Sequence, residues 1–189
     1  MKFLVYGTKG WIGGKVLKYL QENNFEVEEG NSRVENVSQL EEEIREKKPT
    51  HVVSLIGRTH GTYEGKYIGT IDYLEKPGKV FENVRDNLFS PMVLSFLSKK
   101  HDFHFTYLGT GCIFQFDDSH PFGEEKDGFT EEALPNFFGS SYSIIKGFTV
   151  GISNSFIFWS EILSKYLHSA LNELPCADIR TFLFSLICF

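Results

Sequence analysis

Short apolar runs alternate with amphipathic stretches along most of the chain. The apolar runs are typical of buried strands, which we expect at residues 3–6, 25–28, 51–56 and 103–108. The stretches between them predict helices at residues 11–22, 38–48 and 84–100. In the first helix Ile12, Val16 and Leu20 recur every four residues and form one apolar face. Strands that alternate with helices indicate βαβ units, so the pattern predicts an α/β fold with a Rossmann-type, doubly wound parallel sheet.

The βα pattern ends at about Thr149. We therefore divide the chain into an α/β domain at residues 1–148 and an unrelated or aberrant tail at residues 149–189. Within the tail, residues 157–171 have the spacing of a helix, and the last nine residues are either a strand or an apolar end. Ser38 and Glu41 have the spacing of a capping box, which predicts the start of the second helix.

Composition narrows the class of protein. A chain of 189 residues is long enough for one well-packed domain. The net charge of −6 argues against nonspecific binding to nucleic acid. The three cysteines show neither disulfide nor metal-ligand spacing. We see no signal peptide and no apolar stretch near the ~20 residues that span a bilayer, so we expect a cytoplasmic protein without a membrane partner.

A glycine-rich loop follows the first strand and opens the first helix. Its GxxGxxG spacing allows a tight turn and a close approach of the backbone to a pyrophosphate at a helix N-terminus. The alternative is that the glycines serve only the strand-to-helix turn. The residues that we expect to bind the cofactor here are Gly7, Lys9, Gly10, Trp11, Ile12 and Gly13.

The end of the second strand distinguishes NADP from NAD. An acidic residue there binds the ribose 2′-hydroxyl of NAD, whereas arginine accommodates the 2′-phosphate of NADP. Arg33 and Lys9 are the two cations near this position, and they favour NADPH over NADH. In the alternative interpretation Glu28 or Glu29 binds the ribose and Arg33 is solvated.

Tyr142 and Lys146 are four residues apart and so share one helix face. A neighbouring ammonium lowers the pKa of a phenol, which makes general acid–base catalysis possible near neutral pH. Thr110, after the fourth strand, could donate a hydrogen bond to a substrate carbonyl beside Tyr142. Together with the glycine loop, these residues predict hydride transfer between a nicotinamide and a carbonyl carbon.

Four stretches resemble the extended short-chain dehydrogenase/reductase family: KFLVYGTKGWIGG, KPTHVVSLIGRT, GTGCIFQFD and PNFFGSSYSIIKG. More narrowly, they are similar to the nucleotide-rhamnose synthases, which are 3,5-epimerase/4-reductases, and to dTDP-4-dehydrorhamnose reductases. The resemblance covers about Lys2–Phe148. It implies an NADPH-dependent enzyme of dTDP- or UDP-rhamnose synthesis that reduces a nucleotide-linked 4-keto-6-deoxy-hexose, with or without 3,5-epimerisation.

The resemblance also implies roles for individual residues. Tyr142, Lys146 and Thr110 match the catalytic group, and Asn87 matches a structural and catalytic asparagine. Cys112 matches a cysteine that exchanges protons in a related epimerase-reductase. Simpler alternatives are that Asn87 pins its helix, Thr110 caps a strand and Cys112 is an inert thiol. Gly57 and Arg58, after the third strand, are further candidates for contact with the cofactor.

The similarity stops near Thr149, where these enzymes continue into a C-terminal domain that holds the nucleotide-sugar. We therefore expect the chain to lack most of that substrate domain. The alternative function is a non-catalytic NADP-binding regulatory module or an inactive truncated isoform. The resemblance implies pairing through the helices after the third and fourth strands, either as a homodimer or with a full-length isoform. We expect no metal ion, and the sequence leaves dTDP and UDP sugars equally open.

Overall fold

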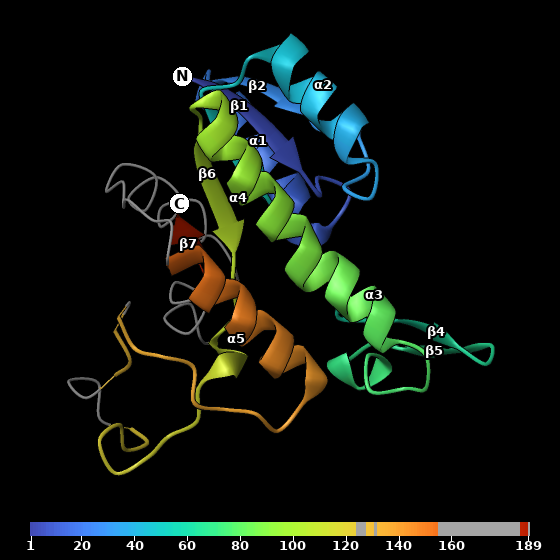
Figure 1. The fold of residues 1–189 in the computed structure, drawn as a ribbon, viewed down its shortest axis with the longest axis vertical. Helices are drawn as coiled ribbons and strands as arrows, with labels where there is room; N and C mark the ends of the chain where they lie inside the picture. Colours follow the sequence, from blue (N-terminus) through green and yellow to red (C-terminus); the bar gives the residue numbers. More distant parts are fainter. Residues whose placement is uncertain (124–127, 131, 155–185, 189) are drawn as a thin grey trace.

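A five-stranded sheet with helices on both faces forms the centre of the molecule (Figure 1). The computed structural model describes residues 1–123, 128–130, 132–154 and 186–188. The sheet order is β2-β1-β3-β6-β7, and the first four of these strands are parallel. Their bounds are β1 Lys2–Tyr6, β2 Glu26–Glu29, β3 His51–Ser54 and β6 His104–Leu108. The predicted Rossmann-type α/β fold is confirmed.

Strand β1 lies inside the sheet, and its side chains alternate between two cores. Phe3 and Val5 pack against α1 (Trp11–Glu22) on one face. Leu4 and Tyr6 pack on the other face, beneath α2 (Val37–Lys47) and α4 (Ser90–His101). A parallel strand covered on both faces must be apolar throughout, which is why the short run at residues 3–6 predicted it correctly.

The predicted helix at residues 84–100 is the larger part of one longer helical segment. It consists of α3 (Val80–Val84), a π-helical turn (Arg85–Phe89) and α4 (Ser90–His101). Figure 1 shows α3 and α4 in line across the front of the sheet. A π-helical turn inserts an extra residue into a helix and often marks a functional site.

Helix α2 begins differently from the prediction. Asn36 is its N-cap, and the Asn36 side chain accepts a hydrogen bond from the Gln39 amide at 3.3 Å. The capping box expected at Ser38 and Glu41 is therefore wrong, because Ser38 already lies inside the helix. Asparagine competes well with serine for the N-cap, and Asn36 precedes the first helical residue directly.

A small hairpin that the sequence analysis did not predict follows β3. It pairs β4 (Gly61–Tyr63) with β5 (Lys66–Ile68), and a short 3₁₀ turn at Ile71–Tyr73 comes next. The two residues of the hairpin turn, Glu64 and Gly65, both have positive φ angles, of 48° and 76°. A two-residue turn ending in glycine between aromatic residues was the signal for this hairpin.

Helix α5 (Ser141–Asn154) crosses the expected boundary at residues 148/149. At this boundary Thr149 is buried, and its hydroxyl donates to the Asn87 carbonyl at 2.7 Å. Strand β7 (Leu186–Cys188) pairs antiparallel with β6 at the edge of the sheet. The helix expected at residues 157–171 lies outside the described residues, and the division into domain and tail stays a prediction.

Candidate active site

The glycine-rich loop joins the carboxyl end of β1 to α1, and two of its glycines are required by close contacts. Gly7 has a φ of +84°, and a Cβ there would lie 2.7 Å from the Leu55 carbonyl carbon. A Cβ on Gly13 would lie 2.1 Å from the Gly7 carbonyl oxygen. Gly10 is the N-cap of α1 and places no side chain over the helix end. No side chain caps the amide groups of the first turn, which is the arrangement that anion sites at helix N-termini use.

The other loop residues differ in their surroundings. Ile12 packs with the core residues under α1, so its role is at least partly structural. Trp11 is 62% exposed, and the Lys15 ammonium lies 5.4 Å from its ring centroid. Lys9 is exposed.

Both an acidic and a basic group stand at the end of β2. Glu28 pairs with Lys2 at 2.8 Å, whereas Glu29 accepts a hydrogen bond from the Thr8 hydroxyl of the glycine loop. Arg33 binds Glu35 at 2.7 Å. Glu29 and Arg33 are thus both in the region where an adenosine ribose binds in this fold, and the geometry alone leaves NAD and NADP open.

Lys146 is almost fully buried on α5, where its ammonium donates to the Tyr107 hydroxyl and, at 3.4 Å, to the Leu108 carbonyl. Burial lowers the pKa of Lys146 to about 7. The ammonium also lies 6.0 Å from the Tyr142 ring centroid, as the shared helix face predicted. Tyr107 was missed from the sequence. Its signal was a hydroxyl-bearing side chain near the carboxyl end of the fourth strand, directly before the GTGC stretch.

Tyr142 is buried beside Thr110 and Cys112. Burial raises the pKa of Tyr142, the Thr110 hydroxyl opposes this shift, and the nearby Cys112 adds to it. The expected lowering of the Tyr142 pKa by Lys146 is therefore not seen in this structure, because the hydrogen bond of the ammonium goes to Tyr107 instead. The Thr110 hydroxyl also accepts from the Cys112 amide at 3.3 Å, and Cys112 is an exposed free thiol.

Asn87 lies in the π-helical turn and is completely buried. Its amide nitrogen donates to the Arg58 carbonyl at 2.8 Å, and its amide oxygen accepts from the Arg58 amide at 3.0 Å. A Cβ on Gly57 would lie 3.3 Å from that oxygen and 3.9 Å from the Lys146 nitrogen. Asn87 thus ties the loop after β3 to the helix that carries it, and Gly57 leaves room between Asn87 and Lys146.

The Arg58 side chain does not point freely toward a ligand. Its guanidinium binds Asp86 at 3.0 Å and lies 3.8 Å from Glu82. A second buried asparagine, Asn83, joins Asn87 to the start of α5 by donating to the Ser141 hydroxyl at 3.1 Å. The sequence signal for Asn83 was its spacing of four residues before Asn87 on the same helix face.

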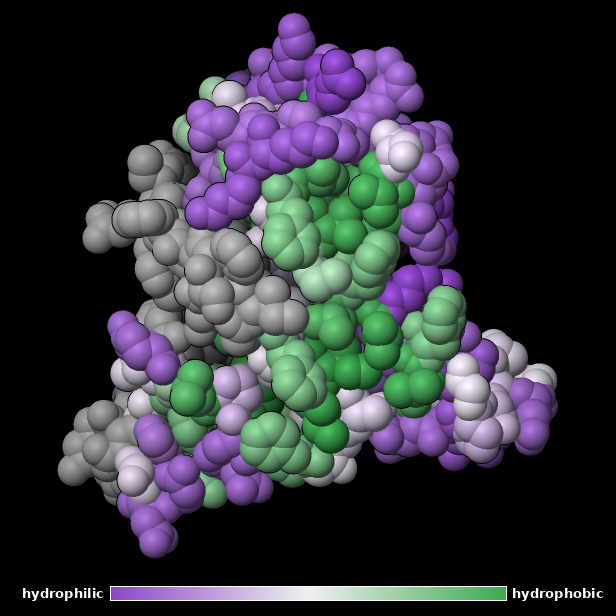
Figure 2. All heavy atoms as spheres, viewed as in Figure 1, coloured by the Kyte–Doolittle hydropathy of each residue, from purple (hydrophilic) through white to green (hydrophobic). Residues whose placement is uncertain are grey.

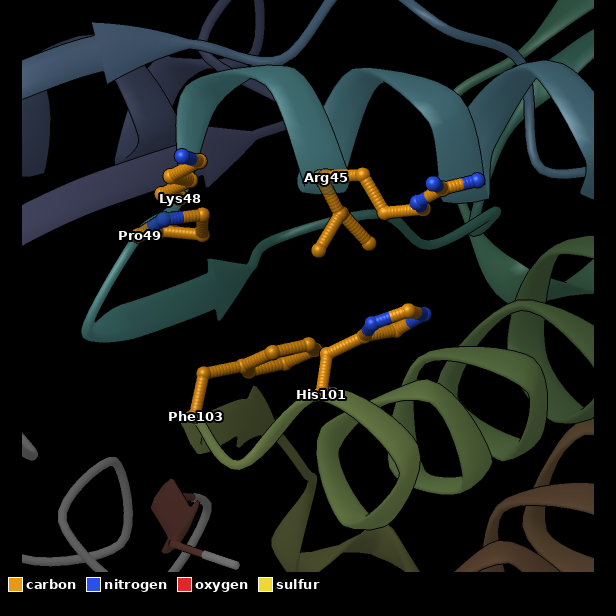
Figure 3. Close-up of a pocket in the computed structure, with 6 residues that line it drawn as sticks. Arg45, Lys48, Pro49, His101 and Phe103 are labelled. Atoms are coloured by element: carbon orange, nitrogen blue, oxygen red, sulfur yellow. The ribbon is translucent and has the colours of Figure 1, made fainter.

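The predicted residues therefore gather at the carboxyl edge of the parallel sheet, where ligands bind in open α/β folds. Those after β3 and β6 and on α5 form one cluster, and the glycine loop follows β1 at the same edge. A pocket of about 330 Å³ lies at the opposite edge, between α2 and the end of α4 (Figure 3). It is lined by Ile44, Arg45, Lys48, Pro49, His101 and Phe103, none of which was predicted as a site residue.

No group of three or more histidine, cysteine or acidic side chains in residues 1–123, 128–130, 132–154 and 186–188 is arranged to hold a metal ion. Within the same part of the chain, no helix combines the length and apolarity needed to cross a bilayer.

Comparison with known proteins found similar chains, although no family model matches. An uncharacterized protein of Acanthamoeba polyphaga mimivirus is 51% identical over 149 residues, which is 79% of this chain and 50% of that protein. A trifunctional UDP-glucose 4,6-dehydratase/UDP-4-keto-6-deoxy-D-glucose 3,5-epimerase/UDP-4-keto-L-rhamnose-reductase of Arabidopsis thaliana is 37% identical over 148 residues, or 77% of this chain and 20% of that protein.

Solved structures agree with these relatives. The crystal structure of a UDP-rhamnose synthase from the same mimivirus has a TM-score of 0.74 and 50% identity, covering 82% of this chain and 52% of that one. A dTDP-4-dehydrorhamnose reductase from Bacillus anthracis in complex with NADP has a TM-score of 0.63 at 15% identity, covering 82% and 50%, and shows likeness of fold alone. The chain thus spans 50% of the length of the mimivirus protein and 20% of the length of the Arabidopsis enzyme. These similarities confirm the resemblance that the motifs predicted.

Proposed function

We propose that this chain has the function of the nucleotide-rhamnose synthases, with which it is homologous over about half of the length of the mimivirus relative. The proposed reaction is the NADPH-dependent reduction, with accompanying 3,5-epimerisation, of a nucleotide-linked 4-keto-6-deoxy-hexose. The observation that carries the proposal is the cluster of Thr110, Tyr142 and Lys146 at the carboxyl ends of the strands. It adjoins the glycine loop at the edge where this fold binds dinucleotides.

The reduction needs a hydride and a proton at the sugar ketone. NADPH, when bound, supplies the hydride to C4. Tyr142 donates the proton to the ketone oxygen, and Thr110 hydrogen-bonds the same oxygen and holds it toward Tyr142. Burial lowers the pKa of Lys146 to about 7, and its protonated form, 6.0 Å from the Tyr142 ring centroid, would favour the phenolate electrostatically once its hydrogen bond turns from Tyr107 to Tyr142.

Epimerisation needs a base that removes the proton from the carbon next to the ketone, whose C–H bond the carbonyl acidifies, and an acid that returns a proton to the opposite face of that carbon. Cys112 is proposed for one of these two proton transfers. Cys112 is suited to this step since its thiol is exposed and lies close to Tyr142. A reducing, cytoplasmic setting would keep this thiol free. Asn87 and Gly57 act through position, by keeping the loop after β3 against Lys146.

The cofactor is proposed to be NADPH, with Arg33 and Lys9 binding its 2′-phosphate. Glu29 supports the competing choice, NADH, because its carboxylate lies against the glycine loop at the end of β2. Kd values for NADPH and NADH, measured by fluorescence on the purified chain, distinguish the two. A tighter Kd for NADH would assign the ribose to Glu29 and reject the 2′-phosphate site.

The catalytic proposal is tested with NADPH and either UDP- or dTDP-4-keto-6-deoxy-glucose, by following nicotinamide absorbance. We expect turnover with one of the two sugars, and about 10²–10⁴-fold slower turnover for Tyr142→Phe. Tyr19→Phe, which removes a phenol on α1 away from the site, is the control. Cofactor binding without turnover by the unaltered chain would instead support the second candidate, a non-catalytic NADP-binding module or inactive isoform.

The same chain is proposed to pair with a second copy or with a longer isoform through α3, α4 and α5. Exposed apolar side chains support this: Phe81 is 71% exposed and Phe96 52% exposed, and Val84 lies between them. Phe148 on α5 is also exposed. Figure 2 shows the hydrophobic band that runs along this face. A large apolar patch on the surface of a folded protein usually marks a site where another protein binds and buries it.

A further inference from the structure

The loop that follows β2 is held from below by one buried carboxylate. Glu43 of α2 accepts hydrogen bonds from the Asn31 amide at 2.8 Å and from the Ser32 amide at 3.0 Å. The Tyr6 hydroxyl donates to the same carboxylate at 3.0 Å, and the Lys47 ammonium lies 3.1 Å from it. Glu43 is only 9% exposed, and each of its carboxylate oxygens accepts at least one hydrogen bond.

The charge of Glu43 is retained despite its burial. Burial alone would raise the pKa of this carboxyl, but the amides of Asn31 and Ser32, with Lys47 beside them, outweigh it and lower the pKa to about 2. A carboxylate that accepts several amide hydrogen bonds is stabilised in its charged form. The contacts therefore persist throughout the range of pH in which a cell operates.

The first residue of the loop is fixed from the same side. A Cβ on Gly30 would lie 2.2 Å from the buried Tyr6 ring, and the Gly30 amide donates to the Val5 carbonyl at 2.8 Å. Tyr6 thus supports the loop at Gly30 and also binds Glu43. The next residue after the anchored pair is Arg33, whose carbonyl accepts from the Asn36 amide at 3.0 Å at the start of α2.

We propose that Glu43 is a positioning residue for cofactor recognition: it presets the loop Gly30–Arg33 so that Arg33 meets the phosphate on the adenosine ribose. The inference rests on the proposed binding of NADPH. A preset loop loses less conformational freedom when the ligand binds, and so gives higher affinity for the same contacts. Glu43 itself never touches the cofactor, because it lies beneath the loop.

Glu43→Gln is the informative change. In the unaltered protein both carboxylate oxygens of Glu43 accept hydrogen bonds. The glutamine side chain has nearly the same shape, but its NH₂ group must take the place of one of these oxygens. At least one backbone N–H would then face another donor. Glu42→Gln is the matched control, since the neighbouring Glu42 is exposed on the same helix.

Two measurements test the inference. Hydrogen exchange of the Asn31 and Ser32 amides reports on the anchor without any ligand, and we expect about tenfold faster exchange in Glu43→Gln and no change in Glu42→Gln. Calorimetry with 2′,5′-ADP and 5′-ADP reports on recognition. The unaltered chain should prefer 2′,5′-ADP, and Glu43→Gln should lose most of that preference while Glu42→Gln keeps it.

The outcomes separate this inference from the proposed function. Unchanged exchange, or an unchanged preference between the two nucleotides, would overturn the role of Glu43. Failure of the unaltered chain to bind either nucleotide would overturn the cofactor proposal and with it the recognition role, whereas the exchange rates would still decide whether Glu43 anchors the loop. If Glu43→Gln does not fold, Glu43→Asp retains the charge and withdraws it by one methylene, and the same two losses are expected.

Discussion

Gly13 illustrates how one residue joins fold and site. It lies in the first turn of α1, and its lack of a side chain lets the helix approach the Gly7 carbonyl behind the glycine loop. Gly14, the next residue, has a different environment, because a Cβ there would lie 3.5 Å from the Thr8 carbonyl oxygen in ordinary contact. The sequence shows two adjacent glycines, and the contacts distinguish the one that is required.

We expect Gly13→Ala to lower the free energy of unfolding by about 1–3 kcal/mol, because the new Cβ would overlap backbone atoms that cannot move aside easily. Gly14→Ala should instead be neutral or stabilising by about 0.5–1 kcal/mol, since alanine is favoured over glycine in a helix. Urea unfolding followed by circular dichroism measures both. Equal effects of the two substitutions would contradict the close approach at Gly13.

At the scale of elements, the pairing of β3 with β6 creates a half-buried histidine pair. The register sets His51 opposite His104, with ring centroids 5.3 Å apart. Burial lowers the pKa of His51 to about 4, and the charge of His104 and the N-terminus add to the shift. Burial also lowers the pKa of His104, whose buried Nε2 has no hydrogen-bond partner among the residues that the structure describes. Both rings are therefore neutral in the folded sheet.

The pair should make stability depend on pH. A histidine whose folded pKa is depressed binds its proton more readily in the unfolded chain, so stability is full above about pH 6.5 and falls as the pH drops toward 4. Replacing one ring by His104→Phe should make this fall shallower in urea unfolding between pH 7.5 and 5. Other groups titrate in the same range, so the difference from the unaltered chain is the quantity that matters.

The exposed His60 provides a control for the histidine pair. His60→Gln changes a ring outside the sheet, and we expect the slope of stability against pH to stay as it is. A slope that is just as steep in His104→Phe as in the unaltered chain would show that the pair does not account for the acid sensitivity.

At the scale of the whole molecule, the apolar band on α3, α4 and α5 bears on association. Phe81, Val84 and Phe96 are exposed along one helical segment, with Leu88 and Met92 half-buried between them. This spacing of three, four and seven residues is that of a helix face that packs against a partner. The opposite side of α4 packs against the parallel sheet, so the exposed apolar side chains of the band are not needed to fill the hydrophobic core.

We expect sedimentation velocity to show association that increases with protein concentration. Phe96→Glu places a charge in the middle of the band and should shift the population toward monomer, by about tenfold or more in Kd, because an unpaired charge resists burial. Lys18→Glu, at an exposed position of α1 on the opposite face of the sheet, is the control for the change of charge. Association that is equally strong in Phe96→Glu would exclude this face.

Much of the architecture could be predicted because it depends on neighbours in the chain. The apolar run at β1 and the four-residue period of α1 each identify their element, and the spacing of Tyr142 and Lys146 places both on one helix face. The hairpin of β4 and β5 and the Asn36 cap were missed although their signals are local. The signal for the hairpin was a single two-residue turn between very short strands, and the Asn36 cap competed with the capping-box spacing of Ser38 and Glu41.

Other features arise only when distant segments are packed together. Lys146 meets Tyr107 across 39 positions of the chain, and Glu43 meets Asn31 across 12. The lowered pKa of Lys146 and the raised pKa of Tyr142 follow from burial, which depends on what covers each side chain. From composition and spacing the expected effect on Tyr142 had the opposite sign, because a sequence shows the charges near a group and omits its desolvation.

The sequence by itself determined the alternation of the four parallel strands with their helices, the glycine spacing of the loop after β1 and the residue types of the cluster at the carboxyl edge of the sheet. These are properties of short segments, set by periodicity and backbone conformation. The tertiary structure decided which hydrogen bond Lys146 makes, how Asn87 holds the loop after β3, and that Glu43 lies under the loop after β2. Such contacts depend on strand register and helix packing, and a buried charge or amide is stable only where the completed fold provides its partners.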